Sequence, residues 1–262
     1  MACLVAHSQR NHVSTRVTAP WFELAVVAVA VLSAATASVV GFGIGSFLTP
    51  LMAIRYGTAA AIAAVTIPHA VATALRCWRL RHHVDRRVLT RFGVVSALGG
   101  LAGALAFSRA GSRALTAVLG ILLLLTAAAQ LGGLAKAWRP HGALATLLGL
   151  GSGLFGGVAG NQGGLRAAAL ASFGLAPAAF VATSTATGLM VDAARAPIYL
   201  LRSGHLLHGM SLPIMLGTAG VIAGTLLGER VMLGLRREQF ARVVAVAVGL
   251  LGIWLVARAL ID

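Results

Sequence analysis

Eight long stretches of the chain contain no charged residue, and they limit the possible fold more than any other feature of the sequence. Hydrophobic residues make up 58% of the 262 residues and charged residues only 10%, which is not the composition of a soluble globular protein. Because a membrane-spanning helix needs about 20 mostly apolar residues, the sequence predicts an all-α, polytopic transmembrane bundle of about eight spans. The stretches are Leu24–Ile54, Tyr56–Leu75, Phe92–Ser108, Ala114–Ala135, Pro140–Leu165, Ala167–Val191, Ser203–Gly228 and Val243–Ala257.

Two glycine-rich segments interrupt these stretches at corresponding places in the two halves of the chain. GFGIGSFLTP begins at Gly41, and VAGNQGGLRA begins at Val158. An offset of 117 residues superposes Gly43 on Gly160. Lipid cannot hydrogen-bond the backbone groups that a broken helix frees, so a break is tolerated only where it is buried in protein or lines a watery cavity. Broken helices in corresponding positions of two halves are typical of a transporter binding site.

This repeat sets the expected domain organisation. We expect a polar N-terminal tail at residues 1–20 and a single transmembrane domain at 21–262, with one repeat at about 21–135 and a second at about 140–262. Each half is predicted to contain a helix, a glycine-rich break, a second helix, a basic loop and two further helices. Glycines spaced along the later helices are expected to let neighbouring helices approach closely.

The breaks are the candidate binding site, and their chemistry favours an anion. The second part of a broken helix begins with unpaired N–H groups and about half a positive charge, which attract an anion. The chain has 21 Lys and Arg but only six Asp and Glu, whereas cation transporters normally need carboxylates within the membrane. The candidate substrate-binding residues are Gly41, Gly43, Gly45, Ser46, Pro50, Thr66, Gly160, Asn161, Gln162, Gly163, Gly164, Arg166, Thr183 and Ser184.

Some of these residues have a second interpretation that the sequence leaves open. Thr183 and Ser184 either contact an oxyanion or bond back to their own helix. Arg166 either helps to select the substrate or is an interfacial arginine that reaches the lipid headgroups.

Asp192, Arg195 and His69 are candidates for coupling transport to protons. Asp192 lies well inside an apolar segment, and ionisable residues within a membrane are functional candidates by default. Arg195 follows three residues later, so the alternative is an ion pair on one helix face that merely neutralises charge. His69 can carry a proton or can simply be a satisfied interior residue.

The net charge of +15 does not indicate nucleic-acid binding, because the basic residues are scattered between apolar segments. They are densest in the loop at 76–91, which is typical of a cytoplasmic loop that contacts anionic lipids. Cys3, Cys77 and the dispersed histidines show no metal-ligand or catalytic spacing, so no metal, no cofactor and no enzymatic activity are expected. A small anion, membrane lipids and a second copy of the chain in a homodimer are the expected partners.

The first break resembles a known family. GFGIGSFLTPL is similar to the glycine-rich run, closed by Pro and Leu, of the sulfite exporter TauE/SafE family of membrane permeases. Gly160, Gly163, Gly164 and VATST at 181–185 resemble a second copy of this motif, although Arg166 and Ala167 depart from it. The resemblance extends over about 21–261. It implies a multi-pass protein of the bacterial inner membrane, a secondary transporter that exports small sulfur-containing or carboxylate anions such as sulfite, sulfonates and sulfoacetate.

Two questions remain open at the level of the sequence. The same breaks could build a passive, channel-like anion pore, which would neither saturate nor couple to a gradient. Eight simple spans with both termini in the cytoplasm place the basic residues at 230–242 outside, against the positive-inside rule. If 160–201 crosses the membrane twice, or if one break is re-entrant, that loop moves inside and the two halves become inverted.

Overall fold

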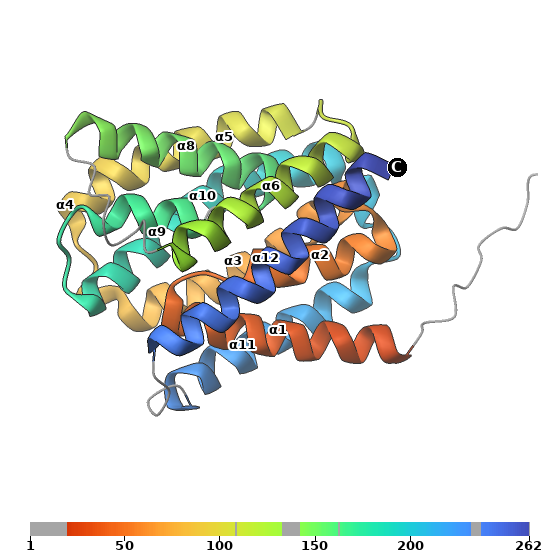
Figure 1. The fold of residues 1–262 in the computed structure, drawn as a ribbon, viewed down its shortest axis with the longest axis horizontal. Helices are drawn as coiled ribbons and strands as arrows, with labels where there is room; N and C mark the ends of the chain where they lie inside the picture. The colour runs from red at the N-terminus through yellow and green to blue at the C-terminus, as the bar shows by residue number, and fades with distance from the viewer. Residues whose placement is uncertain (1–19, 108, 133–141, 162, 232–236, 262) are drawn as a thin grey trace, which may run out of the picture.

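A computed structural model describes residues 20–107, 109–132, 142–161, 163–231 and 237–261. This part of the chain is helical and contains no strand, which confirms the predicted all-α bundle (Figure 1). The helices are α1 (Pro20–Val40), α2 (Ile44–Tyr56), α3 (Thr58–Leu80), α4 (Arg86–Val88), α5 (Val94–Phe107), α6 (Ser112–Leu131), α8 (Ala143–Ala159), α9 (Gly163–Ala171), α10 (Pro177–Ser203), α11 (Ser211–Val231) and α12 (Arg237–Ile261), with short turns at η1 (Arg81–His83), η2 (Leu89–Gly93) and η3 (Gly204–Leu207).

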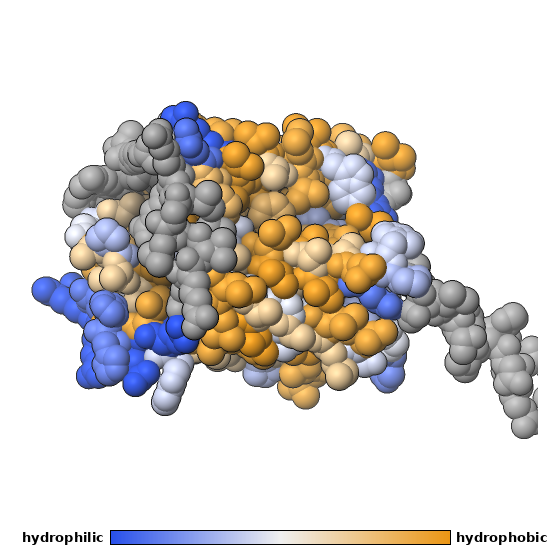
Figure 2. Space-filling view, turned by 90° about the horizontal axis from the view of Figure 1, so that it is seen from below, coloured by the Kyte–Doolittle hydropathy of each residue, from blue (hydrophilic) through white to orange (hydrophobic). Residues whose placement is uncertain are grey.

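The surface is that of a membrane protein. Six helices in the described residues are long and apolar enough to cross a membrane. Large apolar side chains such as Leu32, Leu147 and Leu250 are exposed on different helices. Figure 2 shows hydrophobic residues covering the middle of one face, with hydrophilic residues gathered toward its ends. The chain is therefore an integral, multi-pass membrane protein.

The two halves run in opposite directions. α3 and α10 hold the same position in their halves and pack against each other, with His69 of α3 touching Asp192 of α10. Ala63, earlier in α3, lies beside Tyr199, later in α10, so the two helices are antiparallel. The start of α6 likewise contacts the end of α12. Because corresponding helices are antiparallel, the two halves are related by a pseudo-twofold axis that lies in the membrane plane. This is the arrangement of inverted repeats.

The halves also exchange helices. α1 packs parallel against α11 of the second half, and α8 packs parallel against α5 of the first half. Glycines permit both approaches, because a Cβ atom on Gly224 would collide with the backbone of Val31, and one on Gly153 with the backbone of Ser96. Small residues at such contacts let membrane helices come close together.

We expect Gly153→Leu to disrupt the α5–α8 contact. The added side chain has no room beside the Ser96 carbonyl, and overpacking of this kind costs at least about 1–3 kcal/mol. Fluorescence-detected size-exclusion chromatography after mild heating should show loss of the monodisperse peak. Gly151 provides the matched control in the same helix, because its Cβ position has open space around it and Gly151→Leu should behave as wild type. Equal stability of the two variants would contradict the packing described here.

The breaks are related by a slightly different offset from the one that the glycine pattern suggested. α2 and α9 begin at Ile44 and Gly163, which are 119 residues apart, and α3 and α10 begin at Thr58 and Pro177 with the same offset. Gly41 and Gly160, the positive-φ glycines that follow the first helix of each break, are also 119 residues apart. The two breaks each contain three glycines, but the spacing after the first one differs, so matching the glycines by sequence gave another offset.

One end of the bundle, here called the basic end, carries the connection between α3 and α5 and the starts of α10 and α12. Exposed Arg81, Arg86, Arg87 and Arg91 lie in that connection, and exposed Arg242 lies near the start of α12. The inverted arrangement thus brings these exposed arginines of both halves to one side. By the positive-inside rule, we expect this side to face the cytoplasm. The described chain begins and ends at the opposite end (Figure 1).

Candidate functional site

Two helix breaks meet inside the bundle. Gly41 directly follows α1 and Gly160 directly follows α8, and both glycines have a positive φ, 86° and 70°. Residues with a side chain rarely adopt this conformation, which is common where a helix terminates. Each glycine amide closes the last turn by donating to a carbonyl oxygen 3.0 Å away, that of Ala37 or of Gly156. The chain then starts a second, shorter helix.

The N-termini of these shorter helices, α2 and α9, lie at the junction. Their first N–H groups have no partner within the helix, and each terminus has about half a positive charge. The two breaks are in contact: a Cβ atom on Gly45 would lie 2.5 Å from the Gly160 carbonyl oxygen, and Ser46 Oγ donates to Asn161 Oδ1 at 3.4 Å. An anion at this junction would face positive helix ends from both halves.

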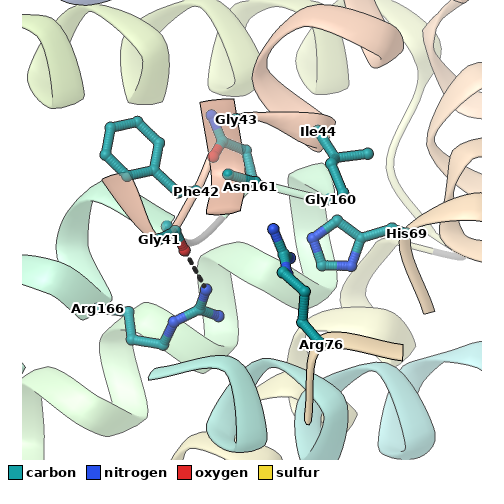
Figure 3. A pocket seen from close by; sticks show the side chains of 12 residues that line it. Gly41, Phe42, Gly43, Ile44, His69, Arg76, Gly160, Asn161 and Arg166 are labelled. Atoms are coloured by element: carbon teal, nitrogen blue, oxygen red, sulfur yellow. Dashed lines mark hydrogen bonds between the residues drawn. The ribbon is translucent and has the colours of Figure 1, made fainter. Parts of the chain in front are cut away.

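A narrow cavity opens at the junction. His69, Arg76 and Arg166 point into the same space from three sides (Figure 3). The cavity volume is about 10 Å³, which is room for about one water molecule. A larger anion can therefore enter only when the lining residues move apart. Of the residues predicted from sequence, the cavity brings together Gly41, Gly43, Gly45, His69, Gly160, Asn161, Gly163 and Arg166.

Arg166 of α9 reaches across to the first break. Its Nε donates to Ser184 Oγ at 3.0 Å, and one of its terminal nitrogens donates to the Gly41 carbonyl at 3.5 Å, the dashed bond in Figure 3. Its other terminal nitrogen, Nη1, is buried and has no hydrogen-bond partner. The side chain is only 4% exposed, so it is not an arginine that extends to the lipid headgroups.

Asn161 has a second buried donor without a hydrogen-bond partner, and like Arg166 it lines the cavity. Its Oδ1 accepts the Ser46 hydroxyl, whereas its Nδ2 is buried without a partner. Burying an unsatisfied donor costs about 1–3 kcal/mol, and such groups are rare unless they serve a purpose. Asn161 and Arg166 therefore offer N–H groups to an acceptor at the break.

Arg76 is a cavity residue that the sequence analysis did not select. It follows an apolar stretch directly and was assigned to the basic loop at 76–91, but α3 continues to Leu80 and buries Arg76 to 4% exposure. The 119-residue offset between the helix starts places Arg76 on Arg195. Because Arg195 had been selected as a candidate site residue, its match with Arg76 in the first half could have identified Arg76 as a candidate too.

Asp192 links the two halves next to the cavity. Its Oδ2 lies 2.6 Å from His69 Nδ1 on α3, and its Oδ1 lies 2.8 Å from a terminal nitrogen of Arg195. Arg195 in turn donates to the Gly156 carbonyl at 2.5 Å, and the Tyr199 hydroxyl donates to the Gly157 carbonyl. Both carbonyls lie in the last turn of α8, and that of Gly156 also accepts the Gly160 amide, so Arg195 and Tyr199 bind α10 to the end of α8.

Comparison with protein-family models matches residues 26–255 to the sulfite exporter TauE/SafE family. The chain belongs to this family. TauE/SafE proteins are membrane transporters of sulfite-type anions and are not enzymes. Neither the curated proteins nor the solved structures gave a significant match.

Several of the predicted site residues of this TauE/SafE protein lie outside the cavity. Thr66 donates to the Ile62 carbonyl of its own helix at 2.9 Å. Thr183 Oγ1 accepts the Asp85 amide at the basic end. Pro50 is buried within α2, Gly164 packs against Thr126, and Ser184 holds Arg166 rather than lining the cavity; Gln162 lies outside the described residues.

No group of three or more His, Cys, Asp or Glu side chains in the described part of the chain is arranged to hold a metal ion. The site of this TauE/SafE protein is thus a set of backbone and side-chain N–H donors with one buried carboxylate beside it.

Proposed function

We propose that the chain is a secondary transporter that exports small oxyanions carrying sulfur or carboxylate groups, such as sulfite, sulfonates and sulfoacetate, through the junction of the two breaks. The observation that carries this proposal is the pair of buried, unpartnered donors, Arg166 Nη1 and Asn161 Nδ2, beside the N-termini of α2 and α9. Donors that lack an acceptor in a positively charged cavity match a ligand that is negatively charged and rich in acceptor oxygens.

The buried charges support an anion over a cation. Among the described residues, the buried charged side chains are Arg76, Arg166, Arg195 and Asp192. Three arginines and one carboxylate make the buried ionisable side chains predominantly positive, and charge within the membrane is costly unless it interacts with charge of the opposite sign. A small dianion would provide such interactions, whereas a cation would be repelled.

The narrow cavity supports a carrier rather than an open pore. A pore needs a continuous path of water, but the junction has room for only about one water molecule. Inverted halves with a site between them are also the usual basis of alternating access. A carrier of this kind saturates with substrate, and a passive pore does not.

The membrane potential supports export as the direction. We place the protein in the bacterial inner membrane with its basic end in the cytoplasm. There the inside-negative potential drives each negative charge outward with about 2.3 kcal/mol per 100 mV. An anion carrier then exports without a further energy source. Contact of the exposed arginines at the basic end with anionic lipids, and a homodimer, remain predictions.

Purified protein in proteoliposomes tests the function. Vesicles loaded with labelled sulfoacetate or sulfite should release it faster when valinomycin and a potassium gradient make the interior negative, and the rate should saturate with substrate. Empty vesicles and vesicles loaded with labelled choline, a cation, are the controls. Release that stays proportional to concentration would indicate a passive pore, and absence of release for every anion tested would contradict the proposal.

A further inference from the structure

His69 occupies an unusual position, because it belongs both to the cavity and to the contact between the halves. Its ring lines the cavity together with Arg76 and Arg166, while its Nδ1 contacts Asp192 on the other half at 2.6 Å. Its side chain is 13% exposed, whereas that of Asp192 is fully buried. The imidazole is thus the more accessible member of this pair.

The contacts of Asp192 fix the position of the hydrogen on His69. The carboxylate accepts hydrogen bonds from Arg195 at 3.0 Å and is in ion-pair contact with it at 2.8 Å, which requires the ionised form. An ionised carboxylate can only accept, so His69 Nδ1 must carry the hydrogen that lies between them. The lone pair of the neutral ring is then on Nε2, which is the nitrogen available to a proton.

The charged groups around His69 make its protonation depend on whether an anion is bound in the cavity. The charged and titratable groups that face it are Asp192 and Arg195 from α10, Arg76 from its own helix and Arg166 from α9. The other described segments that line the cavity, from α1, α2 and the end of α8, contribute backbone and uncharged side chains. Three arginines oppose a further positive charge, and one carboxylate favours it. An anion between Arg76 and Arg166 would shift this balance toward the imidazolium.

We propose that His69 binds the proton that crosses the membrane together with the anion, an inference that rests on the proposed function. A proton from water on the side where the cavity is open bonds to Nε2, and on the other side the same bond breaks and the proton returns to water. Asp192 holds the ring and its tautomer throughout. Each ligand favours binding of the other, so anion and proton travel in the same direction.

This coupling has a consequence for charge. A dianion that crosses with one proton carries a single net negative charge, so an inside-negative potential still drives export. Transport should therefore depend on pH through the protein and not only through the speciation of the substrate. A substrate that does not itself titrate near neutral pH is needed to separate the two.

Sulfoacetate is a suitable probe, because its carboxylate is ionised at pH values well above about 4, as for other carboxylic acids. Proteoliposomes with the pH dye pyranine inside are given external sulfoacetate while valinomycin and equal potassium clamp the voltage. We expect wild-type protein to acidify the interior as sulfoacetate enters, with about one proton per anion, and to slow as pH rises from about 6 to about 8. His69→Gln should move no protons with the anion, and its rate should not change over this range. His82→Gln, at an exposed position in the basic loop, should behave as wild type.

A second measurement does not depend on how well the variant folds. Wild-type protein in weakly buffered detergent solution should take up about one proton when sulfoacetate is added near pH 7, and none when choline chloride is added instead. Sulfoacetate flux without proton movement in wild-type protein, or proton movement that persists in His69→Gln, would overturn the inference and leave the proposed function intact. Absence of any sulfoacetate or sulfite flux in wild-type protein would instead count against the proposed function itself.

Discussion

Arg166→Gln should raise the half-saturation concentration for sulfoacetate by about ten- to a hundredfold. The guanidinium has one buried nitrogen without a partner at the cavity, and a hydrogen bond from a charged donor contributes about 1.5–3 kcal/mol. Glutamine can replace neither the charge nor the two parallel donors. Concentration-dependent uptake into proteoliposomes measures the change, and dianions should be affected more than monoanions.

Two further variants give this prediction its controls. Arg166→Lys should give an intermediate value, because it restores the charge but not the planar arrangement of donors. Arg109→Gln changes an arginine that is exposed at the end opposite to the basic end, so its half-saturation concentration should equal that of wild type. An unchanged value in Arg166→Gln would show that Arg166 only joins α9 to Ser184 and Gly41.

Asp192→Asn should lower the free energy of unfolding by about 3–5 kcal/mol. The carboxylate is the partner of both Arg195 and His69, and its loss leaves Arg195 as an uncompensated charge within the bundle. Thermal unfolding followed by tryptophan fluorescence in detergent should show a clearly lower midpoint. The sequence left open whether Asp192 couples transport to protons or pairs with Arg195, and the structure contains the ion pair while a role in coupling stays a prediction.

The double variant Asp192→Asn/Arg195→Gln separates the cost of an unpaired charge from that of altered shape. Removing the guanidinium relieves the uncompensated charge, so the double variant should be more stable than Asp192→Asn alone although it carries one more substitution. If the two substitutions simply add, the stability of this region comes from contacts other than the ion pair.

The sequence was sufficient to predict the fold class and the location of the breaks, because both depend on local chemistry. Charge-free stretches of spanning length can be read directly, and the dense glycines of the first break mark a place where a helix does not continue. Gly41 and Gly160 lie where the structure has its positive-φ helix ends. Arg166 was selected because a charge beside a break is unusual, and it lies in the cavity.

The tertiary contacts of the site could not be predicted in the same way. The contact between His69 and Asp192 depends on how two distant helices pack, and nothing local in either helix specifies it. Arg76 was missed because the end of a spanning helix cannot be located from hydropathy when a single helix continues through arginines toward the surface. Thr183 was selected for its hydroxyl, but the rotation of α10 turns that hydroxyl toward the Asp85 amide instead.

The exchange of helices between the halves has a consequence for the order of synthesis. α1 leaves the ribosome first. The helix whose glycines pack against it, α11, is among the last to be made. Ala30 and Val31 must therefore face lipid or a temporary neighbour until Gly220 and Gly224 arrive. A chain truncated before α11 should insert into the membrane and still expose this face, which makes it a substrate for membrane proteases. The exposed face of α1 in the first half is therefore buried only when synthesis of the second half is complete.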